Sequence, residues 1–330
     1  MNTWNDVMQE IQATKKQTPD GRITFDIDAV RRKKMQDIKD HTKRSLIIYA
    51  VDFLNHRKAQ VAGPGIGLDE GDKEGFNEVT ENIKSDKVDV LIHSPGGRAE
   101  AVQSFVEILR SRFKSVRFIV PNIAKSAATM LVLSGDEILL NSVSELGPID
   151  PQFIIPKGDG SRIMAPAQTI IDQFEKAQEN ISKNPKLLVP WLPILQQYGP
   201  SLYQEAQNAI ALSKELVEQW LAKYMFRDDR EKSAKAKSIA GYLGDHNNFK
   251  SHAKRIGLQD IISINALKDL KIVNMEADKE LNNKIWGLYH AISITFGMTP
   301  AFKIFENTEE RALIISLQIV EMPGQISPKG

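Results

Sequence analysis

The sequence predicts an α/β protein, and three features between residues 88 and 152 support that prediction. Short apolar and β-branched runs at 88–93, 115–120 and 137–140 are typical of buried parallel strands. Ser94-Pro-Gly-Gly97 ends the first run, and a helical spacing of apolar residues follows it. A serine flanked by alanines follows the second run and opens another apolar helix. Strands, turns and helices therefore alternate, as in a sheet covered by helices.

The chain before this region is expected to be helical and then to enter the sheet. Residues 4–13 predict a short amphipathic helix, and residues 18–21 (Thr-Pro-Asp-Gly) predict a turn. Residues 26–43 predict a charged helix, which would be solvated in isolation or serve as a docking arm in an oligomer. Its thin apolar stripe consists of Val30, Met35 and Ile38. Residues 45–53 predict the first buried strand.

Residues 62–75 are rich in glycine and acidic residues. The glycines at 63, 65 and 67 superficially suggest a phosphate-binding turn, but Pro64 interrupts them and no Gly-Lys-Ser/Thr follows. A flexible loop is therefore expected here, followed by a helix over 76–84.

The second half of the sequence is predicted to be mostly helical. Helices are expected at 167–182, 201–226 and 276–296, and a charged helix is expected to start at 228–237. Residues 184–198 are an apolar segment interrupted by prolines. Residues 311–320 predict an edge strand, and residues 322–330 predict a frayed tail. We divide the chain into an N-terminal helical arm (1–44), a catalytic core (45–262) and a C-terminal helix and strand extension (263–330).

Composition excludes several classes of protein. Lys and Arg number 43 and Asp and Glu 42, so the net charge of +1 gives no field that would attract nucleic acid. The absence of cysteine removes disulfides and thiolate metal sites, and fits a reducing compartment. Residues 1–18 lack the apolar core of a signal peptide, and no window approaches 18 uncharged apolar residues. We expect a cytoplasmic protein without a cofactor or a membrane span.

The chemistry suggested by residues 94–129 is nucleophilic catalysis. A neutral serine is a poor nucleophile unless a base lies beside it and backbone amides face the developing oxyanion. Ser126 has small neighbours and lies at a predicted helix start, where the Ala127 amide would face the same point as the amides of Gly96 and Gly97. The alternative is a purely structural role, in which the serine only caps a helix and the glycine pair only makes a turn.

Four stretches of the sequence resemble the serine dehydrogenase proteinase family of the Clp-protease/crotonase fold group. They are Ser94–Gly97, Val120–Thr129, Gly135–Ile138 and Leu146–Gln152. The resemblance is detailed over 46–153 and implies a ββα spiral core, a serine peptidase activity, Ser126 as nucleophile, and Gly96, Gly97 and Ala127 as oxyanion donors. One position departs from the family pattern, because Ala128 replaces a glycine.

The general base is less clearly indicated than the nucleophile. Clp proteases have a histidine where this chain has Asp150-Pro-Gln152. The segment 245–258 resembles the Clp-protease stretch that carries the catalytic aspartate, and it places Asp245 at that position with His246 beside it. We therefore favour His246 as the base, because an imidazole titrates near neutral pH, with Asp150 or Asp245 orienting it.

Other titratable side chains are weaker candidates for the base. Lys214 would make a Ser–Lys dyad, and His93 would act from the end of its strand. We expect His252 to be solvated and Lys125 to point away from Ser126. The histidines show no metal-ligand spacing, and His246 and His252 are six residues apart, so no metal site is expected.

The resemblance therefore implies a serine peptidase that forms an acyl-enzyme on Ser126. Its substrate would be an extended peptide laid near residues 96–98, and its assembly a homo-oligomer of ring form. Two alternatives remain. A crotonase-type acyl-CoA enzyme uses similar oxyanion geometry, and a non-catalytic scaffold would have kept the fold and lost the base.

Overall fold

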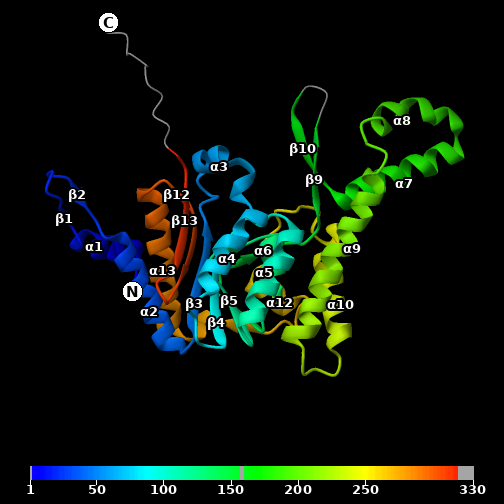
Figure 1. Ribbon diagram of the computed structural model, residues 1–330. Helices are drawn as coiled ribbons and strands as arrows, with labels where there is room; N and C mark the ends of the chain where they lie inside the picture. The colour runs from blue at the N-terminus through cyan, green and yellow to red at the C-terminus, as the bar shows by residue number, and fades with distance from the viewer. Residues whose placement is uncertain (1, 157–159, 319–330) are drawn as a thin grey trace, which may run out of the picture.

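The structure is a computed structural model that describes residues 2–156 and 160–318. At its centre is a seven-stranded sheet in the order β11-β7-β5-β4-β3-β12-β13 (Figure 1). The first five of these strands are parallel, while β12 runs antiparallel to both β3 and β13. The bounds are β3 (Ser45–Val51), β4 (Lys87–His93), β5 (Ser115–Val120), β7 (Glu137–Leu140), β11 (Ile272–Asn274), β12 (Ala301–Asn307) and β13 (Ala312–Ser316).

Alternate residues of each strand face two different helical layers. In β3, Ile47 and Tyr49 belong to one buried cluster, whereas Leu46 and Ile48 belong to the other. Helices α2 (Ile27–Thr42) and α13 (Lys279–Met298) cover the second face. The first face is covered by α4 (Lys73–Thr80), α5 (Ala99–Arg112), α6 (Ala127–Leu133), α9 (Leu202–Trp220, continued by a π-helical turn to Met225) and α10 (Lys232–Leu243). The predicted α/β class is confirmed.

The N-terminal arm packs on its own chain. Helix α1 (Trp4–Ala13) lies against α2 and α13 through a small apolar cluster, and the short strands β1 (Lys16–Gln17) and β2 (Ile23–Thr24) join α1 to α2. Asp26 caps α2 by accepting from the amide of Ala29 at 3.0 Å. The stripe Val30, Met35 and Ile38 is buried inside the molecule. The expectation of a solvated helix is therefore wrong, because α13 and the sheet already cover its apolar face.

Residues 62–75 are not the flexible loop that their composition suggested. Helix α3 (His56–Ala62) is followed by 3-10 turns at 63–66 and 70–72, and α4 begins at Lys73. Asp69 caps the second turn by accepting from the amide of Gly71 at 2.8 Å, and Leu68 is buried. The acidic side chains act as local caps, which their abundance alone did not reveal.

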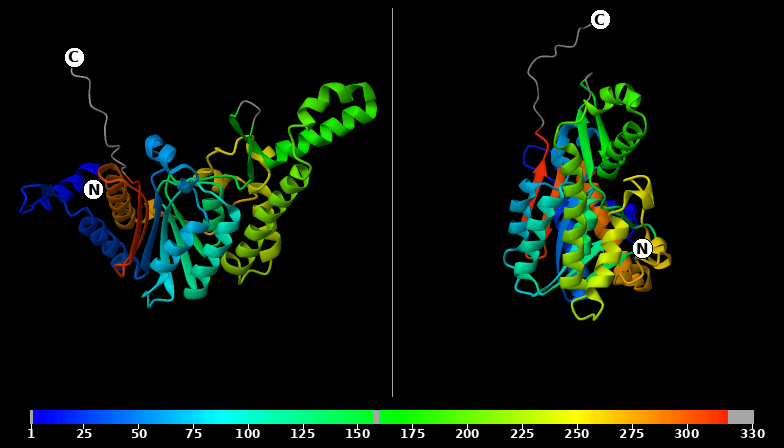
Figure 2. Two further views of the ribbon diagram at one scale, coloured as in Figure 1. Left: turned by 45° about the horizontal axis from the view of Figure 1, so that its top comes forward. Right: turned by 90° about the vertical axis from the view of Figure 1, so that its right-hand side faces the viewer.

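A helical arm projects from the side of the core (Figure 2). It begins with the hairpin β9 (Gln152–Pro156) and β10 (Arg162–Pro166), which was not predicted, and continues through α7 (Ala167–Lys183), a 3-10 turn at 185–187, α8 (Leu188–Leu195) and the first half of α9. Its own apolar cluster joins the hairpin to α7 and α9. The arm therefore has a core separate from the two faces of the sheet.

The chain after α10 returns along the sheet. Helices α11 (His246–Phe249) and α12 (Leu258–Ser263) precede β11, and α13 and β13 correspond to the predicted C-terminal helix and edge strand. The strand between them, β12, was not predicted, although it pairs with β3 inside the sheet. The predicted tail at 322–330 lies outside the described residues.

Candidate active site

Ser126 lies at a tight turn between β6 (Ile123–Ala124) and α6. Its backbone has φ +51° and ψ −123°, which is uncommon for a residue with a side chain. Ser126 is half-buried, and its hydroxyl makes no hydrogen bond, and so no helix cap, within the described part of the chain. A strained turn that leaves a serine hydroxyl unengaged is typical of a nucleophile elbow.

The surrounding hydrogen bonds hold this turn in place. Thr129 Oγ1 donates to the carbonyl of Ala124 at 2.7 Å and accepts from the amide of Gly147 at 3.0 Å. The amide of Ala128 donates to the carbonyl of Lys125 at 2.9 Å. The strain at Ser126 is thus maintained by contacts on both sides of the turn.

The glycine turn after β4 packs directly on Ser126. The amide of Ser94 donates to the carbonyl of Ile123 at 3.0 Å, and the amide of Lys125 donates to the carbonyl of Ser94 at 3.2 Å, so residues 94 and 124 pair. Gly96 has φ +96°, and a Cβ on it would lie 2.8 Å from Ser126 Cβ and 3.0 Å from the Ala127 nitrogen. Only glycine fits this position, both by conformation and by space.

The amides around Ser126 are not equivalent. The Gly96 amide donates to Ser94 Oγ at 3.2 Å. Gly97 pairs with Leu68, whose amide donates to the Gly96 carbonyl at 2.9 Å and whose carbonyl accepts from the Arg98 amide at 2.8 Å. Because successive peptide groups alternate in direction, the Gly97 amide faces away from Leu68. Within the described residues, the amides of Gly97 and Ala127 have no partner in the protein.

A buried polar cluster supports the glycine turn from behind. Lys303 Nζ lies 2.6 Å from Asp72 Oδ1 and donates to the Gly67 carbonyl at 2.7 Å, next to Leu68. Tyr49 Oη donates to Asp72 Oδ2 at 3.1 Å. Burial raises the pKa of Asp72, and burial with the nearby Asp72 charge raises the pKa of Tyr49. Sequence reasoning missed this cluster; its one signal is a lysine inside the apolar run Phe302–Phe305.

The candidate base and its partner lie together. His246 Nδ1 is 2.8 Å from Asp150 Oδ2, and Asp150 is 3% exposed. Asp245 instead caps α11 by accepting from the amide of Asn247 at 3.0 Å. Asp150 is tied to the neighbourhood of Ser126, because the amide of Gly147 binds Thr129 and that of Ile149 donates to the Leu243 carbonyl at 3.0 Å.

His252 is not solvated as expected. Its Nδ1 lies 2.7 Å from Asp150 Oδ1, so Asp150 contacts two imidazoles, and Gln152 Nε2 also donates to Asp150 Oδ2 at 3.0 Å. Separation by six residues excluded a shared helix, but a turn between the two histidines brings both rings to one carboxylate. Neither histidine is hydrogen-bonded to Ser126 Oγ within residues 2–156 and 160–318.

The other candidates occupy different environments. Lys125 Nζ forms an ion pair with Glu145 at 3.0 Å, and the stem of Lys214 packs beside Gly244. His93 is buried between the rings of Phe53 and Tyr289 on the α13 side of the sheet. Burial lowers the pKa of His93 to about 4, and in the described structure its Nδ1 has no hydrogen-bond partner. His93 is therefore a neutral imidazole at physiological pH.

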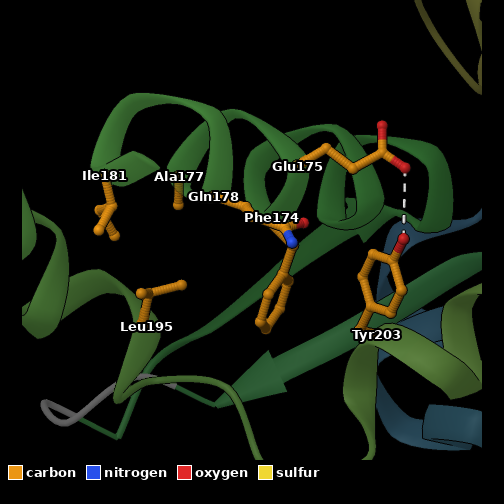
Figure 3. Close-up of a pocket in the computed structure, with 7 residues that line it drawn as sticks. All are labelled: Phe174, Glu175, Ala177, Gln178, Ile181, Leu195 and Tyr203. Carbon is orange, nitrogen blue, oxygen red and sulfur yellow. Dashed lines mark hydrogen bonds between the residues drawn. The ribbon is translucent and has the colours of Figure 1, made fainter. Parts of the chain in front are cut away.

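An apolar pocket lies on the projecting arm (Figure 3). It has a volume of about 400 Å³ and is lined by residues of α7, α8 and α9, including Phe174, Ile181, Leu195 and Tyr203. Tyr203 Oη donates to Glu175 Oε1 at 3.2 Å at its rim. None of the candidate catalytic residues lines it.

Among the described residues, no three His, Asp or Glu side chains are grouped so that they could hold a metal ion. In the same part of the chain, none of the helices has the length and apolar character needed to cross a bilayer.

Two uncharacterized proteins of Methanocaldococcus jannaschii are similar to parts of this chain. MJ1495 is 25% identical over 173 residues, which are 52% of this chain and 51% of that protein. MJ0137 is 32% identical over 84 residues, which are 26% of this chain and 29% of that protein. The chain thus spans about half the length of the first and less than a third of the second.

Among solved structures, similarity is found to a mutant of the 1510-N membrane-bound stomatin-specific protease in complex with a substrate peptide. The identity is 16%, the alignment covers 63% of this chain and 70% of that one, and the TM-score is 0.36. A peptidase from Plasmodium falciparum is 14% identical, with 75% and 99% of the two chains covered and a TM-score of 0.33.

The family model described as ClpP-like SDH-type serine proteinase matches residues 27–190. That range contains β3, β4, β5, β7, the glycine turn and Ser126, together with the first helices of the arm. The family and the Clp-protease-like fold that the motifs predict are therefore confirmed. Residues 27–190 of this chain belong to the ClpP-like SDH-type serine proteinase family.

Proposed function

We propose that this chain is a serine peptidase in which Ser126 forms an acyl-enzyme with the carbonyl carbon of a peptide bond. One observation carries the proposal: Gly96 packs against Ser126 and the Ala127 nitrogen, which places the amide-bearing turn beside the strained serine. Membership of the proteinase family supports the same reaction class.

In the proposed reaction, Ser126 Oγ attacks the substrate carbonyl and negative charge develops on the carbonyl oxygen. The amides of Gly97 and Ala127 are the donors for that oxygen, because neither is engaged by another described group. Gly96 contributes differently, since its amide is held by Ser94 and its missing side chain lets the turn approach Ser126. Loss of one oxyanion donor typically lowers the rate by about 10²–10³.

His246 is the proposed general base. Its Nδ1–H donates to Asp150, which leaves Nε2 with a lone pair to accept the Ser126 proton and return it to the leaving amine. Water then attacks the acyl-enzyme with the same histidine as base. Asp150 takes the orienting role and Asp245 the structural one, because Asp245 already caps α11. Hydrogen bonds to a nucleophile often shorten only when substrate is bound.

The substrate and the assembly are part of the proposal. An extended peptide would lie beside residues 96–98, with its carbonyl facing the two free amides. A homo-oligomer is proposed with the projecting arm as an interface, because α8 exposes Leu188, Val189 and Leu192 to 47%, 75% and 44%.

The test is labelling of the full chain with a fluorophosphonate probe, followed by mass spectrometry of the modified peptide. The label is expected on Ser126 and is expected to vanish in Ser126→Ala, while the matched exposed serine variant Ser111→Ala keeps it. A chain that stays unlabelled at every pH but still assembles would favour the non-catalytic scaffold. An unlabelled chain that turns over an acyl-CoA would favour the crotonase-type reaction.

A further inference from the structure

Asp150 is shared by two histidines, and the proposed reaction uses only one of them. His246 lies at Oδ2 and His252 at Oδ1, at 2.8 Å and 2.7 Å. The carboxylate is buried, while the two imidazoles are 16% and 23% exposed. In a Ser-His-Asp triad the carboxylate needs only one imidazole to hold the base. The second contact therefore requires an explanation.

The backbone brings His252 to this position by a specific turn. Lys250 ends α11 in the left-handed conformation, with φ +57°, and its amide donates to the His246 carbonyl at 2.8 Å. The chain consequently reverses between the two histidines. Beyond His252, the amide and carbonyl of Ile256 pair with those of Leu146, both at 3.0 Å. The segment that carries His252 is thus held on one side by the turn at Lys250 and on the other by the pairing of Ile256 with Leu146.

The segment that carries His252 also contacts the turn that carries Ser126. Lys125 Nζ donates to the Lys254 carbonyl at 3.3 Å and forms an ion pair with Glu145. Arg255 Nε lies 3.6 Å from the other oxygen of Glu145. The charges of Lys125, Glu145 and Arg255 are therefore paired with one another, and Asp245 is engaged as a helix cap. Asp150 is the carboxylate that both imidazoles contact.

We propose that His252 is a positioning residue: by donating from Nδ1 to Asp150 Oδ1, it fixes the carboxylate so that Oδ2 holds His246 in the tautomer with a free Nε2. This inference rests on the proposed peptidase function. A buried carboxylate with a hydrogen-bond donor on only one oxygen can rotate about its Cβ–Cγ bond. Such a rotation would also change the orientation of His246. Gln152 and His252 together prevent that rotation by occupying sites on both oxygens.

Asparagine provides a sharp test of this role, because its side-chain NH₂ can replace the Nδ1–H donor of histidine without titrating. We expect His252→Ala to lower kcat about 10-fold to 100-fold with KM unchanged, by analogy with the loss seen when an outer hydrogen-bond partner of a metal-bound histidine is removed. His252→Asn should restore most of that loss. His246→Asn should remain inactive, because it keeps a donor to Asp150 but has no base. His41→Ala is the matched control, since His41 Nε2 lies 2.7 Å from Asp278 in a histidine–carboxylate pair that joins α2 to α13.

The second readout does not depend on activity. In protein labelled with ¹⁵N-histidine, the His246 resonances report its tautomer and its titration with pH. His252→Ala should shift the His246 titration and mix its tautomers, whereas His252→Asn and His41→Ala should leave both as in the wild type. Thermal unfolding of each variant separates this effect from misfolding.

The possible results separate the two proposals. Unchanged kcat and an unchanged His246 titration in His252→Ala would overturn the positioning role. Activity in His246→Asn combined with its loss in both His252 variants would also overturn it, because His252 would then be the base. If Ser126 resists the probe while the His246 tautomer still changes in His252→Ala, the peptidase proposal fails, but the link from His252 through Asp150 to His246 is supported.

Discussion

Lys303 and Asp72 form a buried ion pair directly behind the glycine turn. Their Nζ and Oδ1 atoms are 2.6 Å apart although 231 residues separate them in the sequence, and their side chains are 2% and 1% exposed. The same ammonium holds the carbonyl of Gly67, and the next residue, Leu68, pairs with Gly97. Strand β12 therefore supports the turn that presents the proposed oxyanion donor.

Breaking this pair should destabilise the fold and impair the site. Lys303→Met leaves the Asp72 carboxylate buried without its cation, and such changes typically cost about 3–5 kcal/mol. The double variant Lys303→Met/Asp72→Leu should recover much of that loss, because no uncompensated charge remains. Urea unfolding of the single and double variants measures the loss of stability and its recovery.

An exposed pair provides the control for the Lys303 variants. Lys284 lies 2.6 Å from Glu280 one helical turn away, and Lys284→Met should change the free energy of unfolding by less than about 0.5 kcal/mol. A Lys303→Met variant no less stable than Lys284→Met would contradict the supporting role.

Gly96 should tolerate no side chain. A Cβ there would lie 2.5 Å from the Lys125 carbonyl oxygen, in a backbone conformation that L-residues rarely adopt. Gly96→Ala should therefore displace Ser126 from the Gly97 amide and lower the rate of probe labelling by about 10² or more. Gly65→Ala is the control, since nothing lies within 4 Å of its added Cβ. Equal labelling of the two variants would show that the close approach is not needed.

Much of the fold was predictable because its signals are local. The apolar runs of β3, β4, β5 and β7 and the periodicity of α5 depend on residues next to one another in the sequence. The approach of the glycine turn to Ser126 followed from motif resemblance, since adjacent parallel strands end at one edge of the sheet. These parts of the site needed no knowledge of distant contacts.

The parts of the fold and of the site that were not predicted depend on contacts between segments distant in the sequence. Lys303 interrupts an apolar run, yet that run pairs with β3 inside the sheet because the buried Asp72 carboxylate compensates the lysine charge. His252 meets Asp150 because Lys250 adopts a left-handed conformation, which no pattern around it indicated. Long-range pairing of charges and single backbone reversals leave no periodic trace in a sequence.

His93 should make stability depend on pH in the acid range. Burial lowers its pKa from 6.5 to about 4 in the folded state. Above the unfolded pKa both states are neutral and stability is complete. As the pH falls from 6.5 toward 4, the unfolded state binds a proton that the folded state does not, so stability decreases by about 3 kcal/mol in total.

The variant His93→Phe should remove this part of the pH dependence, because phenylalanine fills the space between Phe53 and Tyr289 without titrating. Urea unfolding between about pH 7 and pH 4.5 measures the slope. His56→Phe, at an exposed position, should leave the wild-type slope unchanged. An identical slope in wild type and His93→Phe would mean that the pKa of His93 is not lowered in the folded protein.

Ser126 should be a site where function lowers stability. Its positive φ is a conformation that costs a residue with a Cβ roughly 1–2 kcal/mol relative to glycine. Ser126→Gly should therefore raise the free energy of unfolding by about 1 kcal/mol while abolishing labelling, whereas Ser126→Ala should abolish labelling without that gain because alanine keeps the strain. Urea unfolding of the wild type and the two variants in one buffer compares their free energies of unfolding. A glycine variant no more stable than the alanine variant would show that the turn carries no strain, and the unusual backbone would then be no sign of a nucleophile.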